Sequence, residues 1–196
     1  MKVLLALASY LIGSIPTGYI FVRLAERKDI RQFGSRSTGA TNVLRVRGLK
    51  SAIPVAAIDV LKGFLPAFLA LTFLGDPVFA SACAFFSVLG HCFPFSIGFR
   101  GGKGVATSLG AYAAIAWRPW LAALFVFGLT AGVSRFVSLG SILGSIAYPF
   151  FVLAFGGPKG VFYFSLAISA LIVLKHAGNI GRLLRGEERK LGERAS

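Results

Sequence analysis

The segment from Gly98 to Thr107 has the residue types best suited to binding an anion. Four glycines fall within seven residues, and they leave the backbone free to approach a ligand closely. Arg100 and Lys103 add positive charge and hydrogen-bond donors. The residues from Val105 to Trp117 predict a helix, whose unpaired N-terminal N–H groups also favour an anion. We therefore predict a phosphate cradle in this segment.

The cradle differs from a nucleotide-binding P-loop. Gly104 follows Lys103 at the position where a P-loop needs Ser or Thr, and only three residues separate Gly98 from Gly102. Nucleotide hydrolysis is therefore not expected. A basic turn between two apolar segments would explain Arg100 and Lys103 but not the density of glycine, so an anion site is favoured.

A second polar segment, residues 34–45, contains hydroxyls, an amide and a guanidinium. Thr38, Asn42 and Arg45 share one face of a predicted helix, and such a set suits an oxyanion. A capped surface helix with solvated arginines explains the segment equally well.

A third polar segment, residues 175–188, places three polar side chains along one side of a helix, namely His176, Asn179 and Arg182. The simpler explanation is a basic helix end whose side chains reach the membrane surface. A single histidine near an interface is more often structural than catalytic, and the same holds for His91.

Asp59 and Lys62 lie three residues apart within an apolar segment. Charges inside a membrane are costly and by default indicate function, but the two could equally form a structural pair.

Cys83 and Cys92 would lie about 13 Å apart along one helix, too far to bridge. No Cys/His cluster has the spacing of a metal site, and no catalytic triad or His-x-x-x-x-Asp pattern occurs. We expect neither a metal nor a cofactor.

The composition indicates an integral membrane protein. Of the 196 residues 56% are hydrophobic and only 14% charged, with a net charge of +14. No polar linker or repeat divides the chain, so we expect one domain over residues 1–196. No base-reading module accompanies the positive charge, which excludes nucleic acid and favours membrane orientation and contact with anionic lipid.

Hydropathy predicts an all-α bundle with seven membrane spans. We interpret the first as a retained helix, interrupted between Gly13 and Gly18, because no convincing signal-peptide cleavage site follows it. A short helix is expected at 40–47, ended by Gly48, and turns at 75–77 and at Arg118-Pro119. The predicted spans are residues 1–22, 51–74, 78–97, 105–117, 120–134, 137–155 and 159–175.

The distribution of basic residues predicts the orientation. With the N-terminus outside and the C-terminus cytoplasmic, seventeen Lys and Arg residues face the cytoplasm and three face outward. The fourth span would be only about 20 Å long, so the cradle is expected slightly below the membrane surface unless the membrane thins there. All three polar segments then share one face. This favours an enzyme at the membrane surface over a phosphate or organophosphate transporter, whose site would lie near the midplane, and over a structural or lipid-binding protein.

Together the three segments resemble the acyl-phosphate:glycerol-3-phosphate acyltransferases, the PlsY family of bacterial membrane enzymes. The similar residues are Gly34-Ser35 through Gly39-Ala40-Thr41-Asn42 to Arg45, Gly90-His91 through Gly98 to Thr107, His176 through Asn179 to Arg182-Leu183 and Gly186-Glu187-Glu188, with Asp59 to Gly63.

The resemblance implies transfer of a fatty acyl group from acyl phosphate to the sn-1 hydroxyl of glycerol 3-phosphate. The products are lysophosphatidic acid and phosphate, and neither acyl-CoA nor acyl carrier protein serves as donor. The enzyme would lie in the bacterial cytoplasmic membrane with its site on the cytoplasmic face. It would need no obligate protein partner.

The resemblance also assigns roles to residues. Those expected to be catalytic and to hold glycerol phosphate are Ser35, Arg45, Lys103, His176 and Asn179. The loop from Arg100 to Gly104 and the following helix N-terminus would hold the acyl phosphate, with the tail between spans. Further substrate contacts are expected from Ser37, Thr38, Thr41, Asn42, His91, Arg100, Gly101, Gly102, Gly104, Thr107, Arg182 and Glu188.

The group that accepts the hydroxyl proton is left open between His176 and a phosphoryl oxygen of the donor. We favour the phosphoryl oxygen because no acidic partner that could orient His176 is evident. Whether Lys103 serves the donor, the acceptor or both is also open.

Overall fold

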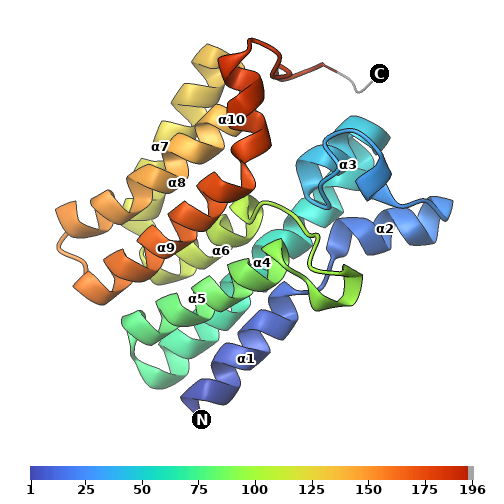
Figure 1. Ribbon diagram of the computed structural model, residues 1–196. Coiled ribbons are helices and arrows are strands. Elements are labelled where there is room, and N and C mark those ends of the chain that lie inside the picture. The colour runs from blue at the N-terminus through green and yellow to red at the C-terminus, as the bar shows by residue number, and fades with distance from the viewer. Residues whose placement is uncertain (194–196) are drawn as a thin grey trace.

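The computed structural model describes residues 1–193, and these form helices without any strand (Figure 1). Two short 3-10 helices are η1 (Ile30–Gln32) and η2 (Phe95–Ile97). The α-helices are α1 (Lys2–Gly13), α2 (Thr17–Glu26), α3 (Ala40–Arg47), α4 (Leu49–Leu74), α5 (Pro77–Cys92), α6 (Val105–Ile115), α7 (Trp117–Ser134), α8 (Val137–Ala154), α9 (Lys159–Lys175) and α10 (Ala177–Leu184).

The predicted helix boundaries agree closely with these elements, with one exception. The helix at 40–47 is α3 and ends at Gly48, and the predicted interruption lies between α1 and α2 around Pro16. The predicted turn at Arg118-Pro119 is wrong, because both residues belong to the first turn of α7. Proline is tolerated there, since the first N–H groups of a helix have no partner within it. The break lies instead at Ala116, whose backbone is extended.

Close backbone contact joins α4 to α6 and so fixes where the cradle helix begins. A Cβ at Gly63 would lie 1.9 Å from the carbonyl oxygen of Thr107, and one at Gly110 would lie 2.0 Å from that of Val60. Only glycine fits at either position, so the two helices approach more closely than side chains would permit. This packing places the first turn of α6 beside the polar residues of α4.

The helices α7, α8 and α9 lie on the side of α6 that faces away from α4 (Figure 1). α7 and α8 pack side by side, α9 packs against both α8 and α5, and α10 turns away from α9 by 58° (Figure 1). In the buried core the rings of Tyr112 on α6 and Tyr148 on α8 stack with their centroids 3.6 Å apart. The bend before α10 directs the third polar segment over the end of the bundle that carries the cradle.

The outer surface of the bundle is apolar, as expected for contact with lipid. Large side chains such as Phe73, Phe125 and Leu174 are exposed. Within residues 1–193, four segments are long and apolar enough to cross a membrane, or five if the bent pair α9–α10 counts as one. α6 is a shorter apolar helix of 11 residues, about 16 Å long. The all-helical membrane class is therefore confirmed, whereas seven spans remain a prediction.

Candidate active site

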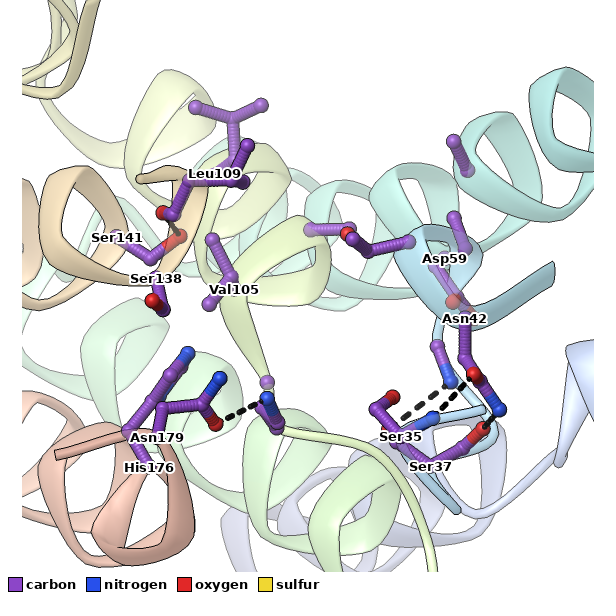
Figure 2. Close-up of a pocket in the computed structure, with 18 of the residues that line it drawn as sticks. Ser35, Ser37, Asn42, Asp59, Val105, Leu109, Ser138, Ser141, His176 and Asn179 are labelled. Atoms are coloured by element: carbon purple, nitrogen blue, oxygen red, sulfur yellow. Dashed lines mark hydrogen bonds between the residues drawn. The ribbon is translucent and has the colours of Figure 1, made fainter. Parts of the chain in front are cut away.

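A cavity of about 250 Å³ lies where α3, α4, α6, α8 and α10 meet, and the polar segments line it (Figure 2). All five residues expected to be catalytic contribute to its wall: Ser35, Arg45, Lys103, His176 and Asn179. Six of the expected substrate contacts also line it: Ser37, Thr41, Asn42, His91, Gly104 and Glu188. Three segments that lie far apart in the chain thus converge on one cavity.

Asn42 on α3 holds the wall that carries the serines. Its side-chain oxygen accepts a hydrogen bond of 2.8 Å from the N–H of Ser35, and its nitrogen donates to the carbonyl of Ser37 at 2.8 Å (Figure 2). The same nitrogen donates to the carbonyl of Phe33 at 3.1 Å. Asn42 is also almost completely buried. Since its polar atoms are occupied, it shapes the loop around Ser35 and Ser37 more directly than it offers a contact for a ligand.

A second wall is a chain of polar contacts that ends at Lys103. The ammonium of Lys103 donates to the side-chain oxygen of Asn179 at 2.5 Å, and the nitrogen of Asn179 donates to Oε1 of Glu188 at 2.6 Å. Ser138 on α8 donates to the same oxygen at 2.8 Å, and Nε of Arg182 donates to Oε2 at 2.8 Å. Glu188 therefore sets the orientation of the Asn179 amide, which in turn fixes Lys103.

Among the residues that the structure describes, no carboxylate pairs with two of the basic side chains in the cavity. Within residues 1–193 neither Lys103 nor Arg45 forms an ion pair. Burial is the main cause that lowers the pKa of Lys103 to about 8; Glu188 acts to raise it, and the nearby Arg182 and Arg45 act with burial. Burial also lowers the pKa of Arg45. Because both charges are poorly solvated, an anion that enters the cavity would stabilise them.

Glu188 itself stays ionised. Burial acts to raise its pKa, but the hydrogen bonds from Asn179, Ser138 and Arg182 outweigh this and hold the pKa below its usual value. Its negative charge is offset by the Arg182 guanidinium and by these hydrogen bonds, so it repels an anionic substrate less than a free carboxylate would.

The N-terminus of α6 follows Lys103 in the chain and borders the cavity. Gly104 takes a backbone φ of +84°, a region that favours glycine, and no side chain caps the helix. In the first turn of the helix, the N–H of Ser108 donates to the carbonyl of Gly104. The preceding residues Val105 and Ala106 line the cavity. This arrangement leaves the first N–H groups and the positive end of the helix dipole beside Lys103.

The loop before α6 is held against His91. The N–H of Gly102 donates to the carbonyl of His91 at 3.0 Å, and a Cβ at Gly102 would lie 2.0 Å from Nε2 of the His91 ring. Nδ1 of the ring lies 3.7 Å from Oδ1 of Asp59, to which Lys62 is paired at 2.8 Å. Lys62 also donates to the carbonyl of Ile15 at the break between α1 and α2. These contacts favour the structural explanation of the Asp59–Lys62 pair.

His176 lies at the bend between α9 and α10 and is almost completely buried. Its Nδ1 lies 2.8 Å from the carbonyl oxygen of Ile172. A carbonyl oxygen only accepts, so the hydrogen of the neutral ring is on Nδ1 and Nε2 is an acceptor. The ring is therefore oriented by a backbone carbonyl and not by an acid.

Six expected substrate contacts are not brought to the cavity wall: Thr38, Arg100, Gly101, Gly102, Thr107 and Arg182. Thr38 and Thr107 are buried, and Arg182 is paired with Glu188. Gly101 and Gly102 lie behind the cavity, where their N–H groups donate to the carbonyls of Cys92 and His91. Arg100 is exposed and lines a separate surface hollow with Asp29, Arg31 and Arg36. Ser138 was not expected at the site, because a serine in an apolar helix carries no distinguishing pattern.

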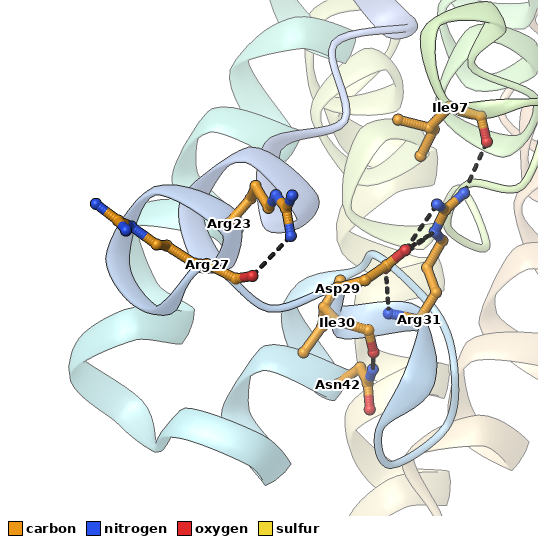
Figure 3. A network of polar contacts seen from close by, with 7 residues as sticks. All are labelled: Arg23, Arg27, Asp29, Ile30, Arg31, Asn42 and Ile97. Atoms are coloured by element: carbon orange, nitrogen blue, oxygen red, sulfur yellow. Dashed lines mark hydrogen bonds and ion pairs between the residues drawn. The ribbon is translucent and has the colours of Figure 1, made fainter.

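A network outside the cavity attaches the first polar segment to the loop before the cradle (Figure 3). Arg31 pairs with Asp29 at 2.8 Å and donates to the carbonyl of Ile97 in η2 at 2.7 Å. The hydrogen bond from Arg31 holds the pKa of Asp29 below its usual value. Since Asn42 also donates weakly to the carbonyl of Ile30, this network and the Ser35 loop form one connected unit.

Fold and cavity together define a helical membrane protein with a basic cavity suited to an anion. The sequence model of the glycerol-3-phosphate acyltransferase family matches residues 3–186, and the chain belongs to this family. The predicted acyltransferase class is thereby confirmed.

Curated relatives and solved structures of this family are similar to the chain over nearly its whole length. The glycerol-3-phosphate acyltransferase of Jannaschia sp. (strain CCS1) is 42% identical over 190 residues, which cover 97% of this chain and 93% of that protein. The same enzyme of Syntrophotalea carbinolica is 43% identical, covering 95% and 96%. A crystal structure of PlsY (YgiH), an integral membrane glycerol 3-phosphate acyltransferase in its glycerol 3-phosphate form, is 39% identical with a TM-score of 0.93, covering 97% and 96%. Its lysophosphatidic acid form has a TM-score of 0.89 at 38% identity, covering 97% and 95%.

Proposed function

We propose that this enzyme transfers a fatty acyl group from acyl phosphate to the sn-1 hydroxyl of glycerol 3-phosphate. The observation that carries the proposal is that one cavity joins two unpaired basic side chains, Lys103 and Arg45, to an uncapped helix N-terminus. Two phosphate groups need two such anion positions. The glycerol 3-phosphate and lysophosphatidic acid forms of the similar PlsY structure support an acceptor and a product of this kind.

The acceptor phosphate would bind between Arg45, Lys103 and the Ser35 loop, where charge-assisted hydrogen bonds are strongest. Its glycerol hydroxyls would then lie toward His176 and Asn179 on the opposite wall. The donor phosphate would bind at the N-terminus of α6, against Gly104 and Val105. Lys103 lies between these two positions and would contact both phosphates.

In the reaction, the hydroxyl oxygen attacks the carbonyl carbon of the donor and the bond from that carbon to the phosphate oxygen breaks. The proton of the sn-1 hydroxyl passes to a phosphoryl oxygen of the departing phosphate, and Nε2 of His176 would accept a hydrogen bond from the neighbouring sn-2 hydroxyl and so orient the acceptor. Acyl phosphate is a mixed anhydride with a good leaving group, so no covalent enzyme intermediate is required. Positioning and electrostatic stabilisation supply the catalysis.

The proposal includes the arrangement in the membrane. One domain of seven spans would place the N-terminus outside and the cavity, the loop before α6 and the C-terminal segment in the cytoplasm, in the cytoplasmic membrane of a bacterium. The excess of Lys and Arg on that face supports it. So does the short α6, which lets a water-soluble acceptor reach a donor embedded in lipid.

The test is reconstitution of the purified chain, without other proteins, in lipid vesicles with labelled glycerol 3-phosphate. Acyl phosphate, acyl-CoA and acyl carrier protein thioester are supplied in separate reactions, and the position of the acyl group in the product is determined. We expect 1-acyl lysophosphatidic acid from acyl phosphate only. Turnover with a thioester but not with acyl phosphate would refute the donor, and a 2-acyl product would refute the regiochemistry.

A further inference from the structure

A second, apolar cleft continues from the cavity into the bundle. It has a volume of about 90 Å³ and is lined by α6, α7 and α8. Four residues line both spaces: Val105, Leu109, Phe127 and Ser141. The cleft exists because α7 packs along α8 and makes few contacts with α6. Because Val105 lines both spaces, the shared end of the cleft lies beside the proposed position of the donor phosphate.

The cleft contains three serines, but they give it no polar character. Each hydroxyl donates to a carbonyl of its own helix: Ser108 to Val105 at 2.9 Å, Ser141 to Val137 at 2.8 Å and Ser145 to Ile142 at 2.9 Å. Because the three hydroxyl hydrogens are already bonded within the helices, none of them is free to donate to a ligand in the cleft. The serines mainly provide small side-chain volume. An apolar chain is thus a better occupant than a polar one.

The far end of the cleft is closed by aromatic rings. Trp120 on α7 and Tyr112 on α6 are the lining residues furthest along their helices from the shared end. Tyr112 is stacked on the fully buried Tyr148, and Trp120 packs against the same core cluster. A chain that runs along the cleft therefore meets these two rings at its end.

We propose that Trp120 determines which chain lengths the enzyme prefers when the acyl chain lies in this cleft. The inference rests on the proposed acyl transfer but not on which donor supplies the acyl group. From Val105 to Tyr112 the cleft runs about 10 Å, the reach of roughly nine bonds of an extended chain. Carbons beyond this point must leave the cleft for lipid or displace Trp120, and both lose packing contacts with the cleft wall.

The first test measures kcat/KM for donors of ten to eighteen carbons. Trp120→Ala opens the end of the cleft, and we expect the ratio of long-chain to short-chain kcat/KM to rise by about tenfold or more, the scale on which apolar pockets discriminate methylenes. Leu124→Trp fills the cleft from α7 and should shift the preference to shorter chains. If acyl phosphate supports no turnover, the series is run with the donor that does, which separates this inference from the donor proposal.

Matched controls lie on the same helix outside the cleft. Trp117 is 60% exposed and Leu121 is 47% exposed, and neither lines it. Trp117→Ala and Leu121→Trp should leave the chain-length ratio within twofold of the wild type. If Trp120→Ala and Leu124→Trp change all chain lengths equally, or no more than these controls, the proposal is wrong.

A second test needs neither turnover nor a variant. A lysophosphatidic acid analogue with a photoreactive diazirine about nine carbons from the carbonyl, the reach estimated above, is bound to the wild-type enzyme in vesicles and irradiated. We expect labelled peptides to contain Tyr112 or Trp120. Labelling confined to lipid-facing positions such as Phe125 would overturn the proposal even if both cleft variants fail to fold.

Discussion

The lowered pKa of Lys103 makes the acceptor step sensitive to alkaline pH. With a pKa of about 8 against an ordinary 10.5, the charged form is disfavoured by about 3 kcal/mol relative to water. Lys103 is protonated below pH 8 and loses its charge above it. Because kcat/KM reports the free enzyme, the value for glycerol 3-phosphate should fall about tenfold from its plateau by pH 9.

Bound phosphate restores the charge, since a nearby negative group raises the pKa of an ammonium. The decline of kcat should therefore begin at a higher pH than that of kcat/KM. Lys103→Arg keeps a positive charge at every accessible pH and should move the alkaline decline of kcat/KM out of range, although its plateau will be lower because the Asn179 contact is altered.

The assay follows labelled lysophosphatidic acid in vesicles between pH 6 and 10, with corrections for spontaneous donor hydrolysis. Enzyme held at pH 10 and returned to pH 7 must recover its activity, which excludes unfolding. A kcat/KM that stays flat to pH 10 in the wild type would refute the reasoning. So would an identical decline in Lys103→Arg, because that would assign the titration to another group.

Three further outcomes are expected from the geometry of the cavity. His176→Ala should lower kcat about tenfold at saturating substrates, whereas a loss of thousands would make His176 the base. Glu188→Gln should lower kcat/KM for glycerol 3-phosphate by at least about tenfold, because the charge that orients Asn179 is lost. Glu187→Gln, at an exposed pair, is its control, and equal effects would contradict this role. Gly102→Ala should lower activity by its clash with the His91 ring. A double-mutant cycle with His91→Ala should show coupling, and strict additivity would argue against the contact.

The chemical character of the site is readable from local sequence. Glycine density, basic residues and hydroxyls at helical spacing are local properties, and they marked all three segments that line the cavity. Apolar runs similarly predicted most helices to within a few residues. The start of α7 was misplaced because Arg118-Pro119 suits a turn as well as a first helical turn, and only packing decides between them.

The roles of individual residues were harder to predict from the sequence than the character of the site. Arg100 and Lys103 look alike in the sequence, yet Arg100 is exposed outside the cavity and Lys103 lies in its wall, because the loop between them turns on its contacts with α5. Asn42 was expected to bind substrate, but its polar atoms hold the Ser35 loop. His176 has an orienting partner that no search for acidic residues could reveal, since that partner is a backbone carbonyl.

The sequence by itself thus determined that this protein is an apolar helical chain with basic, glycine-rich polar segments, because residue type and spacing fix hydropathy and charge. Only the tertiary structure decided that Glu188 orients Asn179 and Lys103, and that a cleft closed by Trp120 continues from the cavity. These features depend on contacts between helices far apart in the chain. Their geometry is set by how closely the backbones pack, as at Gly63 and Gly110, and no local pattern encodes it.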